Sequence, residues 1–569
     1  QYMHMPLPGE SLVAFLSDGA AEEQRGSDWA PRWWRAQDTG LPLPVMIANG
    51  RRIEQRTELG TRAGLDGFMQ HLSRCGFEPL RFDGRDPAAF LCTLFRMEAR
   101  LKRYANDQSR GLRQYPLPIP YGIAETVKGF GFYGAGQNAA HNLPLPGNPR
   151  LDAHARELFN EHAGKLWVPA TELDEACKLL TLHQRQQRPL ERDHVMATRA
   201  PESPALPDPT PRRDSCSPML AVDDFFQELV ARNPGLRPRV GNPDELASNR
   251  LTGVLSALRH RVIDPESPQE SVHGNVITAL NEEAVVSACL ANKAGLNLVA
   301  SYEAFCVKML GAVRQELIFA RHQKEIGRPA RWLGFPVIAT SHTWENGKNE
   351  QSHQDTTFCE ALLGEMNDVM RVVFPADYNS TQALLPDIYS ARGQISCMVI
   401  PKRDRPAAAK VQFVAIGAYQ LSELIHACER LRDTNTPFRL VYVQEPGRFR
   451  QPRDRFEAEY CLSELDKERL IPHRMKHRVI LTHMRPEVFR GHTPWICPDQ
   501  AHSRVLGYIN RGGTLNEAGM LFANRCTWAH ALHAGAALLG RPASDFLTDQ
   551  ELAAVEGNGT PATLIPAAS

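Results

Sequence analysis

Residues 11–20 read SLVAFLSDGA, an apolar run from Leu12 to Leu16 that stops at Ser-Asp-Gly. The pattern returns twice in the next 65 residues or so, as LPVMIANG at 43–50 and FEPLRFDG at 77–84. A compact apolar run that ends in a glycine-containing turn is typical of a β-strand in a parallel sheet. We therefore expect three buried parallel strands here, each stopping at a loop.

Two stretches between and after these strands have the spacing of helices. GLDGFMQHLSRCG covers residues 64–76, and PAAFLCTLFRMEARLKRYA covers residues 87–105 with apolar residues three and four apart. The second stretch ends in basic residues, which suit the negative end of a helix dipole. Alternating strands and helices predict an α/β fold with a mainly parallel sheet covered on both faces.

The chain has 569 residues, too many for one hydrophobic core, and its composition divides it into three α/β domains. Residues 184–218 are rich in proline and charge and predict a linker between a first domain, 1–183, and a second, 219–406. A third domain is expected at 407–555, and residues 556–569 have the composition of a tail. Further strands are expected at 334–341, 369–377, 394–401, 410–418, 439–446 and 477–484.

Charge and cysteine content narrow the class of protein. Lysine plus arginine equals aspartate plus glutamate at 65 each, so no net field favours nucleic acid or an anionic membrane, and a small-molecule partner is expected. The twelve cysteines form no CxxC pair, which predicts reduced and mostly buried thiols in a cytoplasmic protein. We find neither a membrane-length apolar run nor a signal-peptide pattern.

Asp18 and Asn49 are the first candidate functional residues, because each follows a predicted strand. Loops at the carboxyl ends of parallel strands open on one crevice, where ligands bind. Carboxylate and amide oxygens there would suit a magnesium ion that holds a diphosphate. The alternative is that Asp-Gly and Asn-Gly are ordinary turns.

Residues 340–358, TSHTWENGKNEQSHQDTTF, form the second candidate, directly after the strand at 334–339. The loop carries His342 and His353, and α/β proteins often keep acid-base groups in such loops. A solvated surface loop is the alternative.

Three further segments carry candidate residues with ordinary alternatives. Residues 241–251, GNPDELASNRL, resemble a capped helix start. Glu282 precedes a stretch of small and apolar residues, so it is either a buried carboxyl that needs a partner or an exposed helix-start glutamate. Residues 128–146 form a glycine-rich loop with Lys128 and His141, a weak pattern by itself.

Taken together, these segments resemble the phosphoketolases. TSHTW with SHQD, ASNRL, ASYEAF, and KG with AHNLP occur in the family's order and nearly its wording, and the likeness extends from about Leu12 into the third domain. The resemblance implies a thiamine-diphosphate-binding fold of the transketolase kind, a homodimer with the active site between subunits, and magnesium. It also implies cleavage of xylulose 5-phosphate or fructose 6-phosphate, with inorganic phosphate, to acetyl phosphate and an aldose phosphate.

The resemblance assigns roles residue by residue. It implies that magnesium is held by Asp18, Asn49 and the carbonyl of Arg51, and that the cofactor contacts Asp18, Gly19, Asn49, Glu282 and Tyr302. The implied catalytic residues are Glu282, His141, His353 and Lys128. Glu282 would bond the aminopyrimidine ring, while the other three would move protons and stabilise charge at the reacting carbons. The sugar phosphate would be bound by Ser248, Arg250, Asn349, Lys402 and Lys348.

The chain also departs from the family. Only seventeen residues precede Asp18, where the family has a longer stretch with a glycine-histidine-glycine loop, so we expect the first domain to be incomplete at its start, with that region omitted or supplied by another polypeptide. Glu345, Lys348 and Glu350 replace family residues beside the expected phosphate site, and two carboxylates there would repel a dianion unless they face away. The alternatives are therefore a ketol- or acyl-transferring relative in specialised metabolism, or a non-catalytic homologue or one subunit of a split enzyme.

Overall fold

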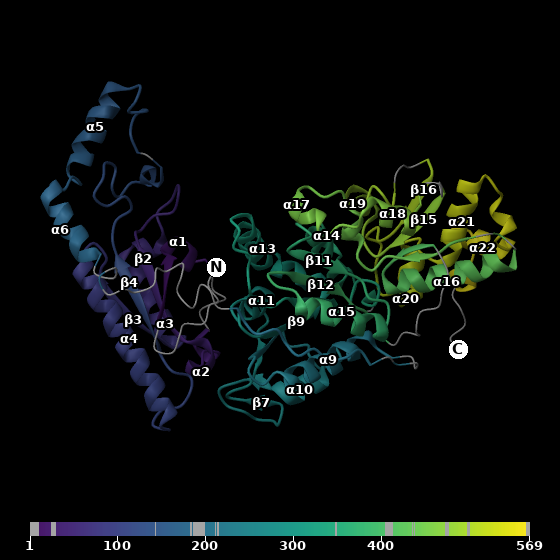
Figure 1. Cartoon of the computed structure of the whole chain (residues 1–569), viewed down its shortest axis with the longest axis horizontal. Coiled ribbons are helices and arrows are strands. Elements are labelled where there is room, and N and C mark those ends of the chain that lie inside the picture. The colour runs from purple at the N-terminus through teal and green to yellow at the C-terminus, as the bar shows by residue number, and fades with distance from the viewer. Residues whose placement is uncertain are drawn as a thin grey trace.

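The computed structural model describes most of the chain and divides it into three parallel sheets (Figure 1). The described residues are 11–23, 30–142, 144–181, 185, 200–210, 212, 216–347, 350–403, 413–434, 436, 438–472, 477–497 and 501–564. The expectation of an α/β protein with three mainly parallel sheets is confirmed.

The first sheet has four parallel strands in the order β1-β2-β4-β3. Its strands are β1 (Ser11–Ser17), β2 (Leu41–Ala48), β3 (Phe77–Asp83) and β4 (Ile119–Glu125). Helix α3 (Arg62–Arg74) covers one face through Phe68 and Leu72, and α4 (Pro87–Ser109) covers the other through Met97 and Leu101. The remaining helices are α1 (Asp18–Ala21), α2 (Ala36–Thr39), α5 (Ala153–Gly164) and α6 (Ala170–Leu180).

The sequence placed the strand at 11–17 correctly but its burial wrongly. Leu12, Phe15 and Leu16 of β1 are 47%, 63% and 39% exposed. The reason is topological: β1 is the edge strand of the sheet, and the core residues of α3 and α4 pack mainly on β2 and β4.

The second sheet has eight parallel strands in the order β11-β12-β10-β9-β5-β8-β6-β7 and lies in the middle of the molecule (Figure 1). Its strands are β5 (Pro238–Asn242), β6 (His260–Arg261), β7 (Glu270–Ser271), β8 (Val276–Thr278), β9 (Leu296–Tyr302), β10 (Phe335–Thr340), β11 (Met370–Val373) and β12 (Ile395–Val399). Its helices are α9 (Pro218–Arg232), α10 (Thr252–Leu258), α11 (Glu282–Leu290), α12 (Glu303–Cys306), α13 (Leu310–Glu325), α14 (Thr357–Leu363) and α15 (Tyr378–Ser390). β9, β10 and β12 are almost entirely buried, as strands covered on both faces by helices must be.

The third sheet has four parallel strands in the order β14-β13-β15-β16. Its strands are β13 (Val414–Ile416), β14 (Val441–Tyr442), β15 (Arg478–Thr482) and β16 (Ser503–Leu506). Its helices are α16 (Ala418–Asp433), α17 (Arg455–Ala458), α18 (Glu464–Leu470), α19 (Pro486–His492), α20 (Glu517–Ala523), α21 (Trp528–Leu539) and α22 (Asp549–Glu556). α16 and α21 supply a core of small and branched residues.

Buried charges join the first domain to the second. The Asp38 carboxylate, after β1 and before β2, pairs with Arg261 and lies 3.1 Å from Arg239 Nη2. Burial alone would raise the pKa of Asp38, but the two arginines outweigh it and hold the pKa below its usual value. Arg35 adds a 2.6 Å hydrogen bond to the carbonyl of Val272.

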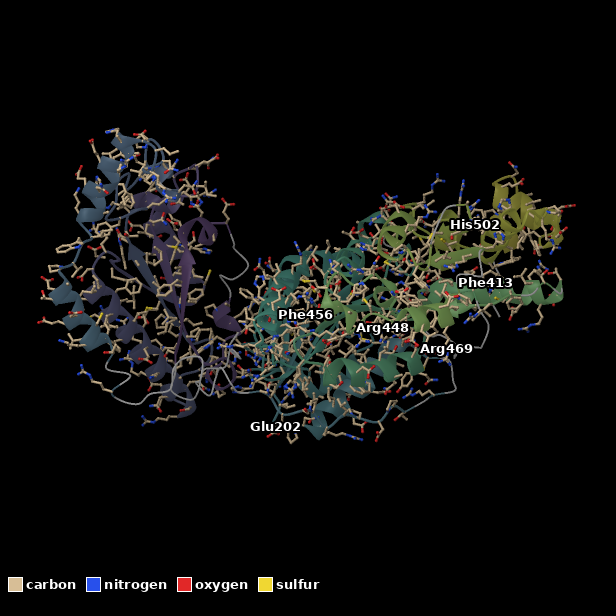
Figure 2. The ribbon with its side chains drawn as sticks, turned by 45° about the horizontal axis from the view of Figure 1, so that its top comes forward. Glu202, Phe413, Arg448, Phe456, Arg469 and His502 are labelled. Atoms are coloured by element: carbon tan, nitrogen blue, oxygen red, sulfur yellow. The ribbon has the colours of Figure 1, made fainter. Side chains whose placement is uncertain are left out.

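The second and third domains are packed together along a longer boundary. Phe456, labelled in Figure 2, lies 4.8 Å from the guanidinium carbon of Arg321 on α13. Arg371 on β11 makes two hydrogen bonds to Glu445, at 2.9 and 3.0 Å. The two domains therefore share a continuous interface.

Two segments expected to lack structure make defined contacts. Ala205, in the described part of the predicted linker, exchanges hydrogen bonds of 2.8 and 2.9 Å with the side chain of Asn233. Leu564, in the predicted tail, is buried in the third-domain core, and its carbonyl accepts a 3.1 Å bond from Trp528 Nε1. Among the described helices, none is long and apolar enough to cross a membrane.

Candidate active site

The candidate residues of the second domain follow adjacent strands of the eight-stranded sheet. Glu282 comes after β8, Ser248 and Arg250 after β5, Tyr302 ends β9, and Lys402 follows β12, while His353 lies in the loop after β10. Because all these strands are parallel neighbours, their carboxyl ends meet at one edge, where α/β proteins bind ligands. The sheet therefore gathers residues that are more than 150 positions apart in the sequence.

Glu282 is the first residue of α11 and is 5% exposed. Asn281 caps the helix by accepting a 2.9 Å hydrogen bond from the Ala284 N–H. Lys308 Nζ forms an ion pair with Glu282 Oε2 at 3.1 Å, and Oε2 has no hydrogen-bond partner among the described residues. Glu282 Oε2 is therefore paired with an ammonium but keeps hydrogen-bonding capacity that a ligand could use.

Aromatic and basic side chains surround this end of the sheet. Tyr302 and Phe305 stack with centroids 6.2 Å apart, and the His353 ring meets Phe305 edge-on at 4.9 Å. Lys402 Nζ lies 5.0 Å from the Tyr302 centroid. The Tyr302 hydroxyl is 3.4 Å from Ser248 Oγ. The structure thus brings four sequence-predicted residues into one group.

Backbone strain also concentrates in these loops. Asp244 and Arg250, after β5, have φ values of 107° and 64°, and Ser341 and Glu350, after β10, have values of 44° and 61°. Non-glycine residues rarely adopt positive φ, and such strain collects at ligand-binding sites. Arg250 is exposed at the same edge, and Lys348 and Asn349 lie outside the described residues.

Glu245 is a candidate that the sequence did not reveal. Residues 241–251 were predicted to begin a helix, but they form turns, because Asn242 Oδ1 accepts bonds from the N–H groups of Asp244 and Glu245 and the helix starts only at Thr252. Burial raises the pKa of Glu245 to about 7, opposed by the Tyr302 N–H and supported by the charge of Glu282. Only the folded turn shows that this carboxyl faces the site.

The first-domain candidates gather at the carboxyl edge of the four-stranded sheet. Asp18 follows β1, and Asn49 follows its neighbour β2. Asp18 is fully buried and accepts bonds from the N–H groups of Gly19 at 2.9 Å and Gly50 at 2.7 Å. Burial raises the pKa of Asp18 despite these bonds. Asn49 Oδ1 accepts a 2.9 Å bond from the Arg51 N–H, so both side chains lie in one loop cluster.

Lys128 and His141 belong to the same edge. Lys128 follows β4, the next strand of the sheet, and donates a hydrogen bond to the carbonyl of Arg52. His141 is exposed at the end of a short helical turn in which Asn138 accepts a 3.1 Å bond from Arg51 Nη1. Within the described ranges, no hydrogen bond, ion pair or ring contact joins this group to the group around Glu282.

The loop at 340–358 is not a solvated surface loop over its first half. Residues 341–347 are buried, and Trp344 is fully enclosed in a cluster with Tyr419 and Tyr508 of the third domain. The Leu515 N–H donates a 3.1 Å bond to the Gly347 carbonyl. The third domain therefore fixes the shape of this loop.

Glu345 does not face the expected phosphate site. Its Oε2 accepts a 3.0 Å bond from the Lys402 N–H, and its Oε1 accepts bonds from the Arg403 N–H at 3.1 Å and the Tyr419 hydroxyl at 3.0 Å. Because these donors offset the negative charge of Glu345, the carboxylate need not repel a bound phosphate. Glu350 is exposed.

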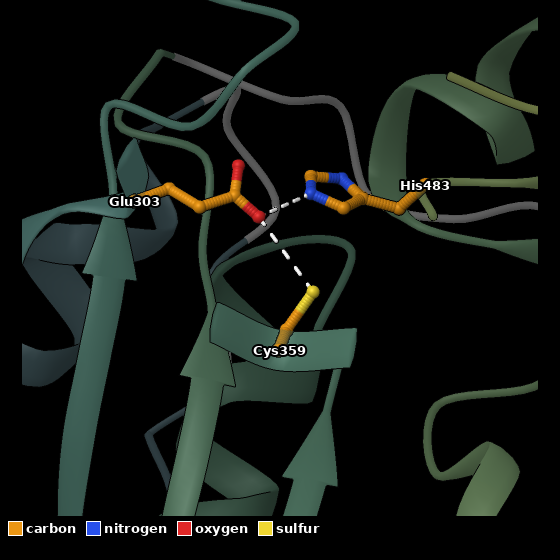
Figure 3. A group of neighbouring side chains, drawn as sticks. All are labelled: Glu303, Cys359 and His483. Carbon is orange, nitrogen blue, oxygen red and sulfur yellow. Dashed lines mark hydrogen bonds and ion pairs between the residues drawn. The ribbon is translucent and has the colours of Figure 1, made fainter. Parts of the chain in front are cut away.

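A second buried cluster is formed by Glu303, Cys359 and His483 (Figure 3). His483 Nε2 is 2.7 Å from Glu303 Oε1, Cys359 Sγ is 3.8 Å from the same oxygen, and the other Glu303 oxygen accepts a 2.8 Å bond from the Thr343 N–H. A tetrahedral metal ion keeps its ligand atoms more than about 3 Å apart, since each lies about 2.0 to 2.3 Å from the ion. Burial also raises the pKa of Cys359 well above its usual value, so it stays a thiol. The cluster is a hydrogen-bonded pair rather than a metal centre.

Solved structures show the class of fold. A transketolase from Pichia stipitis, in complex with sedoheptulose 7-phosphate, superposes with a TM-score of 0.61 at 15% identity, covering 93% of this chain and 76% of its own. A transketolase from Campylobacter jejuni gives a TM-score of 0.62 at 13% identity, covering 92% and 77%. The chain therefore shares the fold of the transketolases.

Sequence comparisons show which proteins the chain resembles. Residues 220–390 match the model for D-xylulose 5-phosphate/D-fructose 6-phosphate phosphoketolase. The xylulose-5-phosphate phosphoketolase of Lactiplantibacillus pentosus is 24% identical over 439 residues, 70% of this chain and 54% of that protein. Probable phosphoketolase 2 of a Nostoc species is 23% identical over 586 residues, 91% and 72%. The chain is similar in sequence to phosphoketolases, as its motifs predicted, and it spans about half the length of the first curated relatives it matches.

Proposed function

We propose that this chain is a thiamine-diphosphate- and magnesium-dependent enzyme that cleaves a ketose phosphate with inorganic phosphate. Xylulose 5-phosphate or fructose 6-phosphate would give acetyl phosphate and a shortened aldose phosphate. The observation that carries the proposal is the buried Glu282 carboxyl at the carboxyl edge of the eight-stranded sheet, whose Oε2 is paired with Lys308 and has no hydrogen-bond partner among the described residues.

The residues present fit the cofactor at its ring end. Glu282 Oε2, Glu245 Oε2 and Asn249 Nδ2 are all buried and make no hydrogen bond of good geometry within the described chain, although Asn249 lies close enough to Glu245 to lower its pKa. Acceptors and a donor left open at one strand edge suit an aminopyrimidine, which offers both kinds of group. Glu282 would hold the ring by a hydrogen bond, and Tyr302 would pack near it.

The first domain offers oxygen donors for the diphosphate end. Asp18 and Asn49 have lone pairs beyond those used by Gly19, Gly50 and Arg51, and magnesium prefers such carboxylate and amide oxygens. When bound, thiamine diphosphate would supply the carbanion chemistry that breaks the carbon–carbon bond. Glu282 would give and take the ring proton.

The remaining residues would handle the substrate. Ser248, Arg250 and Lys402 would bind the sugar phosphate, since a guanidinium offers two donors and an ammonium a point charge. Asn349 and Lys348 are proposed for the same role and lie outside the described residues. His353, His141 and Lys128 would move protons and stabilise charge at the donor carbonyl.

A homodimer follows from the same proposal. The magnesium-binding group and the Glu282 group lie on different sheets, and no described contact joins them within one chain. We propose that the first domain of one subunit completes the site on the second domain of its mate, so that a dimer has two equivalent sites.

The test is a product assay with xylulose 5-phosphate, inorganic phosphate, magnesium and thiamine diphosphate. We expect acetyl phosphate, measured as its hydroxamate, in amounts equal to the aldose phosphate, and none when phosphate is left out. Aldose-dependent formation of a new ketose without acetyl phosphate would favour a ketol-transferring relative, a candidate supported by the altered loop at 345–351. Calorimetry that shows no binding of thiamine diphosphate would instead indicate a non-catalytic homologue or a subunit that needs a partner chain.

A further inference from the structure

The Glu345 carboxylate accepts hydrogen bonds from the two backbone N–H groups that follow β12 and from a third-domain tyrosine. Glu345 is 6% exposed, and its two oxygens accept from the Lys402 N–H at 3.0 Å, the Arg403 N–H at 3.1 Å and the Tyr419 hydroxyl at 3.0 Å. Two successive backbone N–H groups form an anion-binding concavity of the kind that often receives phosphate. Here a carboxylate of the chain itself occupies it.

The side chain of Lys402 extends to Tyr302. Its Nζ lies 5.0 Å from the Tyr302 centroid, and its charge lowers the pKa of Glu245 against the larger effect of burial. Arg403, the next residue, pairs with Glu517 of the third domain. The backbone of Lys402 is therefore anchored on one side while its ammonium reaches the candidate site on the other.

We propose that Glu345 is a positioning residue for Lys402, and that through Lys402 it sets the affinity of the site for the phosphate group of a phosphorylated sugar. This inference rests on the proposed function and deepens it. Glu345 does not touch the substrate: it fixes two N–H groups, so that the long lysine side chain starts from a rigid backbone and loses less freedom when it binds a dianion. A charged acceptor strengthens each of the three bonds.

The same geometry explains how a carboxylate is tolerated beside a phosphate site. Both of its oxygens face N–H or O–H donors, which offset its charge, and it lies on the backbone side of Lys402. Its removal would therefore weaken phosphate binding rather than relieve repulsion. Charge alone predicts the opposite, namely that removing a carboxylate near a phosphate site strengthens phosphate binding.

The experiment compares the binding of fructose 6-phosphate and fructose by calorimetry, with magnesium and thiamine diphosphate present, in a Glu282→Gln background that stops turnover. The ratio of the two dissociation constants measures the contribution of the phosphate. We expect Glu345→Ala and Lys402→Ala each to reduce this ratio about tenfold or more, and the double variant to reduce it little further, because both act on one interaction. Fructose binding should be unchanged.

Tyr419→Phe is the matched control, because it removes one bond from Glu345 but leaves both backbone bonds in place. Tyr419→Phe should leave the ratio of dissociation constants unchanged. Glu345→Gln should retain part of the ratio, because the amide oxygen can still accept a hydrogen bond from a backbone N–H. An equal loss in Tyr419→Phe, or a ratio that Lys402→Ala lowers and Glu345→Ala does not, would overturn the inference alone. A parent protein that binds the two sugars equally would overturn the proposed phosphate site itself.

Discussion

The carboxylate of Glu303 in the second domain lies 2.7 Å from His483 Nε2 in the third, and both side chains are almost completely buried. Glu303 begins α12 directly after β9, and His483 follows β15, so the pair joins the carboxyl ends of two sheets. Burial alone would raise the pKa of Glu303, but the charge and hydrogen bond of His483, the charge of His342 and the Thr343 N–H together hold it below its usual value. The pair is a buried polar contact in the interface between the second and third domains.

Replacing Glu303 by Gln should lower the free energy of unfolding by about 3 kcal/mol, because it leaves a buried histidine without its carboxylate partner. Urea unfolding followed by tryptophan fluorescence measures the change. The double variant with His483→Asn should lose little more than the single one. Additive losses would show that the two side chains act separately.

The stabilisation from Glu303 should also depend on pH. A carboxyl whose folded-state pKa is depressed contributes stability that is present above its unfolded value, 4.5, and is lost as the pH falls through the folded value. The wild type should therefore lose stability relative to Glu303→Gln on acidification below about pH 4.5. An unchanged difference between pH 6 and pH 3 would contradict the assignment.

Glu282→Gln should lower kcat by about 10² to 10⁴ while leaving the fold intact, because it removes the acid-base group at the cofactor ring. The acetyl phosphate assay measures the rate, and circular dichroism checks the fold. Glu283→Gln is the control, since Glu283 is the exposed neighbour in the same helical turn. Equal losses in both variants would remove Glu282 from its proposed role.

Glu245 should make the protein less stable as the pH rises from about 5 to 7. Its folded-state pKa of about 7 is above the unfolded value of 4.5, so its stabilisation is complete below the unfolded value and is lost as the pH rises through the folded one. Thermal unfolding of Glu245→Gln should lack this slope. A parallel pH profile for the wild type and the variant would place the titration elsewhere.

Mixing two inactive variants should restore activity if each site is shared between subunits. Asp18→Asn would remove a ligand of the proposed magnesium site and Glu282→Gln would remove the proposed acid-base group. A mixed dimer would then have one intact site and one doubly altered site. After subunit exchange in equal amounts, about a quarter of the wild-type activity is expected, because half of the dimers are mixed and each has one working site of two. Failure to regain activity, with exchange verified by mass spectrometry, would argue for sites within single chains.

Strand periodicity in the sequence predicted the parallel sheets and the loops that carry Asp18 and Asn49, whereas Lys402 was named only through the resemblance to phosphoketolases. Parallel topology then brings such loops together, which is why residues far apart in the sequence could be grouped in advance. The resemblance to phosphoketolases added Glu282 and Tyr302, which periodicity alone left ambiguous.

The contacts across domains could not be predicted in this way. Residues 341–347 are polar enough to read as a surface loop, yet the third domain buries them. Whether Glu345 faces substrate or backbone depends on Tyr419, which lies 74 positions further along the chain. Glu245 was read as part of a helix start because the alternative turn depends on the side chain of Asn242 and on positive φ at Asp244.

The burial of Trp344 among third-domain side chains has a consequence for recombination between relatives. A crossover point placed between the second and third domains would pair the loop around Trp344 from one parent with third-domain side chains from another. Poor packing there would shift Glu345 and, through its hydrogen bonds, the backbone of Lys402. Chimeras should therefore inherit these two domains as one block, whereas the first domain, held mainly through Asp38 and Arg35, is the natural unit of exchange.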